Sequence, residues 1–236
     1  MPYAGFSGKV ALTDAPSTAK RPYVIMNSAM SLDGKIATWR GRSRLSSPED
    51  LRRVDRLRAK VDGILVGLRT LLADDPKLTV KFARGHSPAR VIADSYARTP
   101  LDAYVVRSAT ETPTIIAVTS RASKRKVRAL ERAGARVLVC GRGRRTSLPL
   151  LLQRLRGLGV QRLLVEGGGT LNWSMLSQGL VDEVSVAISP RIVGGAKSVT
   201  LVEGEGVGRI EDAVRVRLMS VKRYGTDLVA SYRVLS

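Results

Sequence analysis

The feature that most constrains the fold of this chain is the alternation of short aliphatic segments with longer segments of helical periodicity. Runs rich in Val, Leu, Ile and Ala predict buried strands, and apolar residues at helical spacing predict the helices between them. The predicted strands are residues 23–29, 63–67, 90–94, 114–119, 136–140 and 162–166. One predicted helix begins at Pro48 after a capping Ser47, and the others cover residues 124–132, 148–158 and 171–178. This order favours a mostly parallel sheet with crossover helices on its faces.

The last part of the chain has a different pattern. Residues 183–189 alternate between polar and apolar side chains, and residues 214–222 and 228–234 predict two further strands. Gly225 lies in the short connection between these two strands, which suits a hairpin. We therefore expect one α/β domain, residues 21–236, whose sheet is parallel first and antiparallel at its end. Residues 1–20 are rich in small and polar residues and predict a flexible extension.

The composition limits the kinds of site that the chain can form. One cysteine, Cys140, and one histidine, His86, cannot supply an internal disulfide or a four-ligand zinc site. These counts favour a metal-free protein of the cytoplasm, and no apolar stretch reaches the length needed to cross a membrane. The formal net charge of +20 favours anionic ligands, which include phosphorylated small molecules and nucleic acid.

The strongest motif for ligand binding is the run of three glycines at 167–169. It follows a predicted strand that ends at Glu166 and precedes a predicted helix. Glycines let the backbone approach a ligand closely, and the N–H groups at a helix N-terminus bind phosphate. An ordinary tight turn is the alternative, but three adjacent glycines cost more conformational entropy than a plain turn requires. The motif therefore favours a phosphate-containing ligand.

Four other segments are ambiguous by themselves. The sequence around Asp33-Gly34 is typical of a turn, and Asp74-Asp75 before Pro76 can simply end a helix. Residues 92–95 close a predicted strand, and the carboxyl ends of strands are where open α/β sheets bind ligands. Gly194-Gly195 is typical of a loop.

Taken together, five segments in order resemble the pyrimidine reductases of riboflavin biosynthesis. They are residues 27–37, 66–79, 166–172, 180–183 and the Pro190 to Gly195 pattern. The resemblance spans about residues 22–235, and it implies a three-layer dihydrofolate-reductase-like fold. Bacterial members of the family are often fused to a zinc deaminase, whose His/Cys cluster this chain lacks. The chain therefore resembles the stand-alone, archaeal-type form.

The resemblance also implies NADPH as the cofactor, with NADH as the alternative, and a homodimer. The positions that contact the cofactor in the family correspond here to Ala29, Thr70, Asp74, Ser95, Gly167, Gly168, Gly169 and Thr170. The 2′-phosphate of NADPH needs a nearby cation, and Arg98 and Arg121 follow predicted strands.

The implied reaction reduces a ribosylamino-pyrimidinone 5′-phosphate at the C1′ carbon of its ribose. The substrate-binding positions implied by the resemblance are Arg44, Arg58, Leu78, Lys81 and Glu166. Asp33 and Glu166 are the candidate catalytic residues, and we expect Asp33 to position groups rather than to act as a general acid.

Two other functions are compatible with parts of the sequence. A reductase of the same fold that acts on a pterin or a related pyrimidine is the nearer alternative. A basic nucleic-acid-binding protein is the other, but its charge alone explains none of the five segments.

Overall fold

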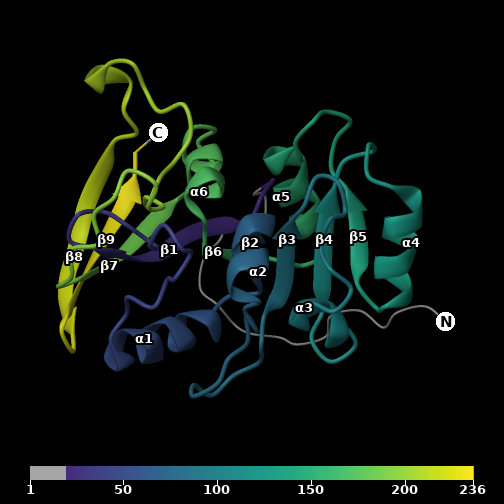
Figure 1. The fold of residues 1–236 in the computed structure, drawn as a ribbon, viewed down its shortest axis with the longest axis horizontal. Coiled ribbons are helices and arrows are strands. Elements are labelled where there is room, and N and C mark those ends of the chain that lie inside the picture. Colours follow the sequence, from purple (N-terminus) through teal and green to yellow (C-terminus); the bar gives the residue numbers. More distant parts are fainter. Residues whose placement is uncertain (1–19, 236) are drawn as a thin grey trace.

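The computed structural model describes residues 20–235, so all but Lys20 of the expected extension at residues 1–20 lies outside the described residues. The fold is built on one nine-stranded sheet in the order β5-β4-β3-β2-β6-β1-β7-β9-β8. β8 forms one end of this sheet, and β5, with helix α4 beside it, forms the other (Figure 1). The described residues contain no helix long and apolar enough to span a membrane.

The strands and helices follow one another along the chain as the aliphatic pattern predicts. The strands are β1 (Tyr23–Ser31), β2 (Gly63–Gly67), β3 (Ala89–Ala93), β4 (Thr114–Val118), β5 (Arg136–Val139), β6 (Arg162–Val165), β7 (Glu183–Ser189), β8 (Val216–Tyr224) and β9 (Asp227–Val234). The helices are α1 (Pro48–Arg58), α2 (Leu68–Asp74), α3 (Tyr104–Arg107), α4 (Lys124–Arg132), α5 (Leu148–Gly157) and α6 (Gly169–Leu176), with the 3-10 turn η1 (Ile210–Asp212).

The direction of pairing changes once across the sheet. β1 to β7 pair in parallel wherever they are neighbours, and β9 pairs antiparallel with both β7 and β8. The expected parallel sheet with an antiparallel C-terminal hairpin is therefore confirmed.

Two apolar cores lie on opposite faces of the sheet, because successive side chains of a strand point to opposite faces. One core joins Met26 and Leu163 to Leu151 of α5 and Met175 of α6. The other joins strand residues such as Ile64 to side chains of α2, α3 and α4, including Leu71, Val105 and Leu130. Helices thus cover both faces, which confirms the three-layer arrangement.

The structure departs from the predicted elements in a few places. β1 continues two residues beyond the predicted end, and β8 begins and ends two residues later than predicted. Helix α2 was not predicted, because it is only seven residues long and follows β2 directly with no side-chain cap at Gly67. Asp75 closes α2 in a left-handed conformation, with φ of 36°, so the Asp74-Asp75 pair does end a helix.

One charged side chain is fully buried beneath α3. The guanidinium of Arg90 on β3 donates hydrogen bonds to the hydroxyls of Thr114 and Ser108 and to the carbonyls of Val105, Ser108 and Thr112. Burial lowers the pKa of Arg90 from its ordinary value. These bonds attach residues 105–112 to the sheet.

Candidate active site

A cavity of about 580 Å³ runs along the carboxyl ends of the parallel strands. Its wall begins at Asn27–Ala29 of β1, passes the ends of β6 and β2, and reaches Ala93–Ser95 after β3. Leu51 and Val54 of α1 close one end, while Arg145 and Thr146, from the segment after β5, close the other. Open α/β sheets bind ligands at this edge.

The triple glycine forms the middle of the cavity wall. Gly167 has φ of 92°, which side chains rarely adopt, and the Gly167–Gly168 peptide bond is cis. The Gly168 N–H donates to Oγ1 of Thr70 at 3.0 Å, so the first turn of α2 is joined to the segment that follows β6. Gly168 is the N-cap of α6 and carries no side chain to cap it. The first-turn N–H groups of α6 are therefore available to a ligand.

Gly169 is closely packed on its other side. A Cβ atom at this position would lie 2.6 Å from the carbonyl oxygen of Thr200 and 2.7 Å from Cγ of Glu203. The N–H of Glu203 also donates to the carbonyl oxygen of Gly169. The loop at 200–203 therefore rests directly on the start of α6, and only glycine fits between them.

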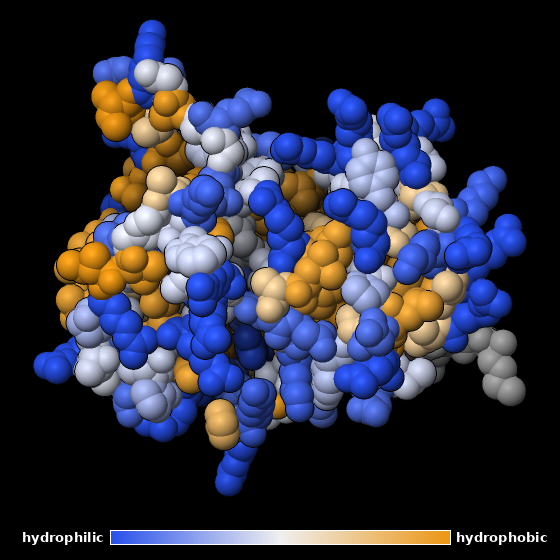
Figure 2. Space-filling view, viewed as in Figure 1, coloured by the Kyte–Doolittle hydropathy of each residue, from blue (hydrophilic) through white to orange (hydrophobic). Residues whose placement is uncertain are grey.

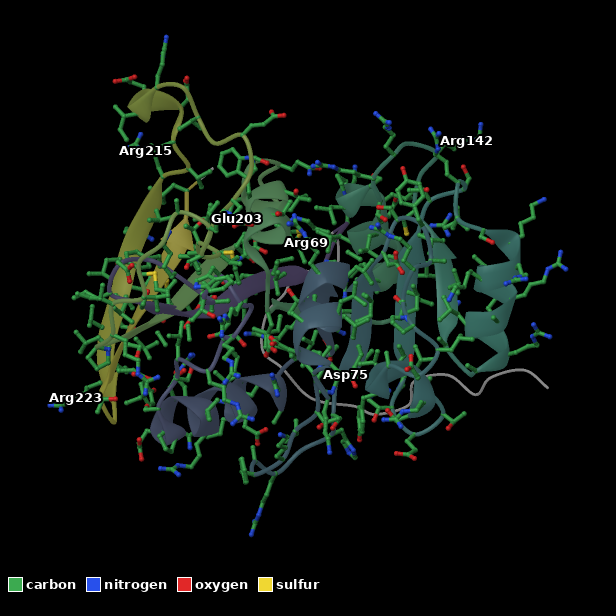
Figure 3. All side chains as sticks on the ribbon, viewed as in Figure 1. Arg69, Asp75, Arg142, Glu203, Arg215 and Arg223 are labelled. Carbon is green, nitrogen blue, oxygen red and sulfur yellow. The ribbon has the colours of Figure 1, made fainter. Side chains whose placement is uncertain are left out.

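Two charged side chains meet at Thr170 on the rim of the cavity. Arg69 of α2 donates from Nη2 to Oγ1 of Thr170 at 2.6 Å, and Oγ1 of Thr170 donates to Oε2 of Glu203 at 3.4 Å. Figure 3 shows Arg69 and Glu203 approaching this point from α2 and from the loop beyond α6. Arg69 adds positive charge beside the N-terminal end of α6, where the helix dipole already favours an anion.

Glu166 forms an ion pair at the α1 end of the cavity. Arg58 donates to Oε1 of Glu166 from Nε at 2.8 Å and to Oε2 from Nη2 at 2.7 Å. Burial opposes the charge on Arg58, but the nearby Glu166 carboxylate outweighs it and raises the pKa of Arg58. The Glu166 side chain thereby faces the cavity with both oxygens hydrogen-bonded to Arg58.

The opposite end of the cavity contains hydroxyls and cations. Oγ of Ser95 accepts a hydrogen bond from the Thr146 N–H at 2.9 Å and lies 3.2 Å from Oγ1 of Thr146. Arg98 and Arg145 line the cavity beside them, and within residues 20–235 neither is in an ion pair with a carboxylate. Arg121, the other cation considered for a 2′-phosphate, does not line the cavity.

Asp33 lies outside the cavity wall and holds two loops together. Oδ1 of Asp33 accepts hydrogen bonds from the Ser31 hydroxyl and the Val193 N–H, and Oδ2 accepts one from the Gly194 N–H. These bonds, led by the one from Ser31, lower the pKa of Asp33 to about 2. The carboxylate is therefore ionised at neutral pH and fixes the loop that contains Gly194.

The structure brings most of the predicted site residues to one cavity. Those in its wall are Ala29, Thr70, Asp74, Ser95, Arg98, Glu166, Gly168, Gly169 and Thr170. The others, Asp33, Arg44, Arg58, Leu78, Lys81 and Gly167, are not in the wall.

Each of the others has a defined structural role or position. Arg58 is paired with Glu166, and Gly167 accepts a hydrogen bond from the Gly67 N–H. Leu78 is buried in the core beside α2, with φ of 52°. Lys81 is exposed, and its backbone N–H donates to Asp55, while the carbonyl of the exposed Arg44 accepts from Arg191.

The polar residues of the cavity wall that were not predicted include Asn27, Arg69, Arg145 and Glu203. Asn27 could have been identified from the sequence, because it is a polar residue that follows the apolar run at the start of β1. The sequence indicated Arg69 less clearly, through its position two residues after the end of a buried strand. Nothing near Glu203 in the sequence indicates that its loop returns to the start of α6.

The wall is suited to binding and orienting a ligand with several phosphates or carbonyl groups. It offers a helix N-terminus, three arginines, hydroxyls and the paired Glu166. Among residues 20–235, no three side chains of His, Cys, Asp or Glu lie close enough together to hold a metal ion.

Comparisons with known proteins agree with this geometry. Residues 22–230 match the family model described as RibD C-terminal domain. The chain is 52% identical over 217 residues to 2,5-diamino-6-ribosylamino-4(3H)-pyrimidinone 5′-phosphate reductase of Methanothermobacter thermautotrophicus, covering 91% of this chain and 99% of the relative.

Two longer relatives are covered only in part. Riboflavin biosynthesis protein RibD of Actinobacillus pleuropneumoniae is 41% identical over 219 residues, which is 92% of this chain and 58% of the relative. The solved structure of RibD from Acinetobacter baumannii superposes with a TM-score of 0.79 at 25% identity, over 92% of this chain and 59% of that one. The chain thus spans about three fifths of these two proteins.

Proposed function

Because this chain belongs to the family of RibD C-terminal domains, we propose that it reduces 2,5-diamino-6-ribosylamino-4(3H)-pyrimidinone 5′-phosphate in riboflavin biosynthesis. The observation that carries this proposal is the 52% identity to the Methanothermobacter thermautotrophicus reductase across 99% of that protein. The proposed product carries a ribityl chain, which forms when the C1′ carbon of the ribose is reduced.

The cofactor in this proposal is a nicotinamide dinucleotide that lies along the cavity. Its proposed contacts are the predicted residues Ala29, Thr70, Asp74 and Ser95 with the triple glycine. The uncapped N-terminus of α6 and the adjacent Arg69 offer N–H donors and positive charge to a diphosphate. The nicotinamide supplies the hydride when it is bound, and the protein orients the reacting groups and excludes water.

NADPH is the preferred cofactor in this proposal, because two cations that have no carboxylate partner within residues 20–235 lie to one side of the proposed diphosphate site. Neighbouring strands are about 4.8 Å apart, so the ends of β6 and β3, separated by β2, are about 10 Å apart. Arg98 follows β3, and Arg145 reaches the same end of the cavity. A 2′-phosphate there would accept charge-assisted hydrogen bonds from both guanidinium groups.

The substrate occupies the α1 end of the cavity in this proposal. Glu166 accepts hydrogen bonds from amino groups of the pyrimidine, and Arg58 keeps its carboxylate in one orientation. Leu51 and Val54 provide an apolar surface against the ring. Arg44 and Lys81 remain the predicted partners of the 5′-phosphate, because both are exposed cations on segments beside α1.

The partner in a homodimer would cover the uncovered apolar face at the end of the sheet. Val216, Leu218 and Val221 of β8 and Leu228 of β9 are all exposed, although they lie on strands. The segment around η1, which projects beside β8, adds Ile210 at 80% exposure (Figure 1). Figure 2 shows apolar side chains gathered on the β8 side of the molecule, with another apolar group near the centre of this face, between largely hydrophilic regions.

Turnover with purified protein tests the function. The protein is mixed with NADPH and the pyrimidine phosphate, and the absorbance of the reduced nicotinamide is followed with time. We expect absorbance loss that requires both the substrate and the protein. Folded protein that gives no turnover with active substrate would refute the proposal, and faster turnover with dihydrofolate would favour the pterin alternative.

A further inference from the structure

A buried hydrogen-bond network lies beneath the α1 end of the cavity and is not used in the function proposed above. Arg53 of α1 donates from Nε to Oδ1 of Asp50 at 2.7 Å. Its Nη2 donates to Oδ1 of Asn27 at 2.9 Å, and its Nη1 donates to Oγ of Ser185 at 3.2 Å. Asp50 is fully buried, and Asn27 is 5% exposed.

The network fixes which way the Asn27 amide points. A guanidinium has five N–H donors and no acceptor, so only the oxygen of the Asn27 amide can face Arg53. Asp50 holds Arg53 in this position through the ion pair between them. The Asn27 nitrogen must therefore point away from Arg53.

The Asn27 nitrogen faces the cavity. Asn27 lies in the cavity wall, and within residues 20–235 its nitrogen has no hydrogen-bond partner. That nitrogen is nevertheless not among the buried polar atoms that lack a partner, so it is accessible. Two N–H donors thus project into the cavity beside Leu51 and Glu166.

We propose that Asn27 donates a hydrogen bond to a carbonyl oxygen of the bound ligands, and that Arg53 is the positioning residue that keeps the amide in the donating orientation. This inference rests on the proposed function, which supplies two such carbonyls, one on the pyrimidinone and one on the carboxamide of the nicotinamide. Asn27 and Glu166 are then complementary: Asn27 binds a hydrogen-bond acceptor of a ligand, and Glu166 binds a hydrogen-bond donor.

The arrangement is more specific than packing requires. Replacing a buried ion pair by apolar residues of similar volume is often neutral for stability. The stability of the fold therefore does not explain why a charged pair lies below the binding site. Within residues 20–235, the buried Oδ2 of Asp50 has no hydrogen-bond partner, so the network is not optimised for stability. Fixing the donor direction at Asn27 accounts for its presence.

The variant Asn27→Asp tests the donor role. A carboxylate of the same size still accepts from Arg53 but presents an acceptor where the cavity had a donor. We expect the KM or Kd of the ligand whose carbonyl oxygen contacts Asn27 to rise at least about tenfold, because a hydrogen-bond acceptor would then face another acceptor. The KM of the pyrimidine substrate and the Kd of NADPH, measured by calorimetry, are the two readouts.

The two readouts separate the possible carbonyls. A higher pyrimidine KM with an unchanged NADPH Kd identifies the pyrimidinone, and the reverse identifies the carboxamide. If Asn27→Asp changes neither value, the inference is overturned while the proposed function stands. If wild-type protein binds no nicotinamide nucleotide and turns over no pyrimidine, the proposed function fails and this inference fails with it.

Variants of Arg53 test the positioning role. Arg53→Met frees the Asn27 amide to rotate, so it should raise the same KM or Kd that Asn27→Asp raises, with a smaller change in kcat. Arg53→Lys still carries only hydrogen-bond donors, so it should keep that KM or Kd near the wild-type value. Arg52→Met is the matched control, because Arg52 is the next residue of α1 and is exposed beside Glu49. An equal loss of ligand affinity in Arg53→Met and Arg53→Lys would contradict the positioning role of Arg53. Asn27→Asp decides the donor role even if Arg53→Met does not fold.

Discussion

Arg58 and Glu166 are joined by two parallel hydrogen bonds of 2.8 Å and 2.7 Å, although 108 residues separate them in the chain. Arg58 is the last residue of α1, and Glu166 directly follows β6 at the start of the glycine motif. The pair therefore attaches the helix at the proposed substrate end of the cavity to the strand that leads to the proposed diphosphate site. Both side chains are mostly buried.

Removal of Arg58 should destabilise the protein more than the loss of an ordinary surface charge. In Arg58→Met, the mostly buried Glu166 loses its ion-pair partner, and we expect the free energy of unfolding to fall by about 3 kcal/mol. The double variant Arg58→Met/Glu166→Gln should recover part of that loss, because no buried charge remains unpaired. Urea unfolding of the three proteins measures these differences.

The exposed pair on the same helix provides the comparison for Arg58. Arg52 and Glu49 also make a 2.7 Å ion pair, but both side chains are largely in solvent. Arg52→Met should therefore change the free energy of unfolding by no more than about 0.5 kcal/mol. Similar decreases in the free energy of unfolding in Arg52→Met and Arg58→Met would show that the pair of Arg58 with Glu166 stabilises the protein no more than an exposed ion pair does.

A methyl group at Gly169 should weaken nucleotide binding. In Gly169→Ala, the Cβ atom would meet the Thr200 carbonyl at 2.6 Å and Glu203 at 2.7 Å, so the 200–203 loop must move away from α6. We expect the Kd of NADPH, measured by calorimetry, to rise at least about tenfold, which is about 1.4 kcal/mol.

Gly157→Ala is the control for the glycine prediction. Gly157 ends α5 and is exposed. Among the described residues 20–235, a Cβ atom added there would meet nothing within 4 Å beyond its chain neighbours and its own helix backbone. This variant should bind NADPH normally and gain up to about 1 kcal/mol of stability, because alanine favours a helix more than glycine does. Unchanged NADPH binding in Gly169→Ala would contradict the assignment of the glycine motif to the cofactor.

The sequence predicted the parts of this molecule that depend on local pattern. Aliphatic runs such as residues 114–118 identify buried strands because nearly every side chain in them is buried. The glycine motif could be identified because its conformational cost and its place between a strand and a helix are both local properties. The hairpin β8–β9 was found from Gly225 and the two flanking strands.

The contacts that complete the site depend on tertiary structure and could not be predicted. Glu203 reaches Thr170 only because the loop after β7 folds back over α6. The direction of the Asn27 amide depends on Arg53, which comes from a different element 26 residues away. Residues with no periodic or turn signal, such as Arg145, become part of the wall through the fold alone.

The cofactor preference should depend on the cations at the β3 end of the cavity. Arg98→Gln or Arg145→Gln removes one charge-assisted hydrogen bond to a 2′-phosphate but leaves NADH binding intact. We expect the ratio of kcat/KM for NADPH to kcat/KM for NADH to fall about tenfold in each variant. Initial rates with both nucleotides measure the ratio.

Arg142→Gln separates a local effect from a general loss of positive charge. Arg142 lies on the same segment as Arg145 and is also exposed, but it is not in the cavity wall, and Figure 3 shows it at the periphery. The cofactor ratio should not change in this variant. An equal decrease of the cofactor ratio in Arg142→Gln and Arg145→Gln would mean that the preference for NADPH depends on the overall charge of the protein.

The apolar face of β8 and β9 should mediate self-association. A dimer would have twice the 25.5 kDa mass of the chain, and Val221→Lys should shift the population toward monomer because it places a charge in the interface. Leu72→Lys is the matched control, since Leu72 is as exposed as Val221, at 55%, but lies on α2. Sedimentation equilibrium that gives a monomeric wild type would refute the expected homodimer.

The stabilising effect of Asp33 should disappear in acid. Its pKa in the folded protein is about 2, below the ordinary value of 3.8, because the Ser31 hydroxyl and the Val193 and Gly194 N–H groups bind the ionised form. A group with a lowered folded pKa contributes stability above its unfolded pKa and loses it as the pH falls through the folded pKa. Asp33→Asn should therefore have a lower Tm than wild type at pH 7, and the two values should converge between about pH 4 and about pH 2.

Asp102→Asn provides the reference for this pH series. Within residues 20–235, the exposed Asp102 carboxylate makes no hydrogen bond or ion pair, so the variant should follow the wild type at every pH. Thermal unfolding followed by circular dichroism gives the Tm of all three proteins. A Tm difference for Asp33→Asn that is the same at neutral pH and near the folded pKa of about 2 would mean that the loop contacts do not depend on the charge of Asp33. The link between residues 31–35 and 191–194 would then depend on packing alone.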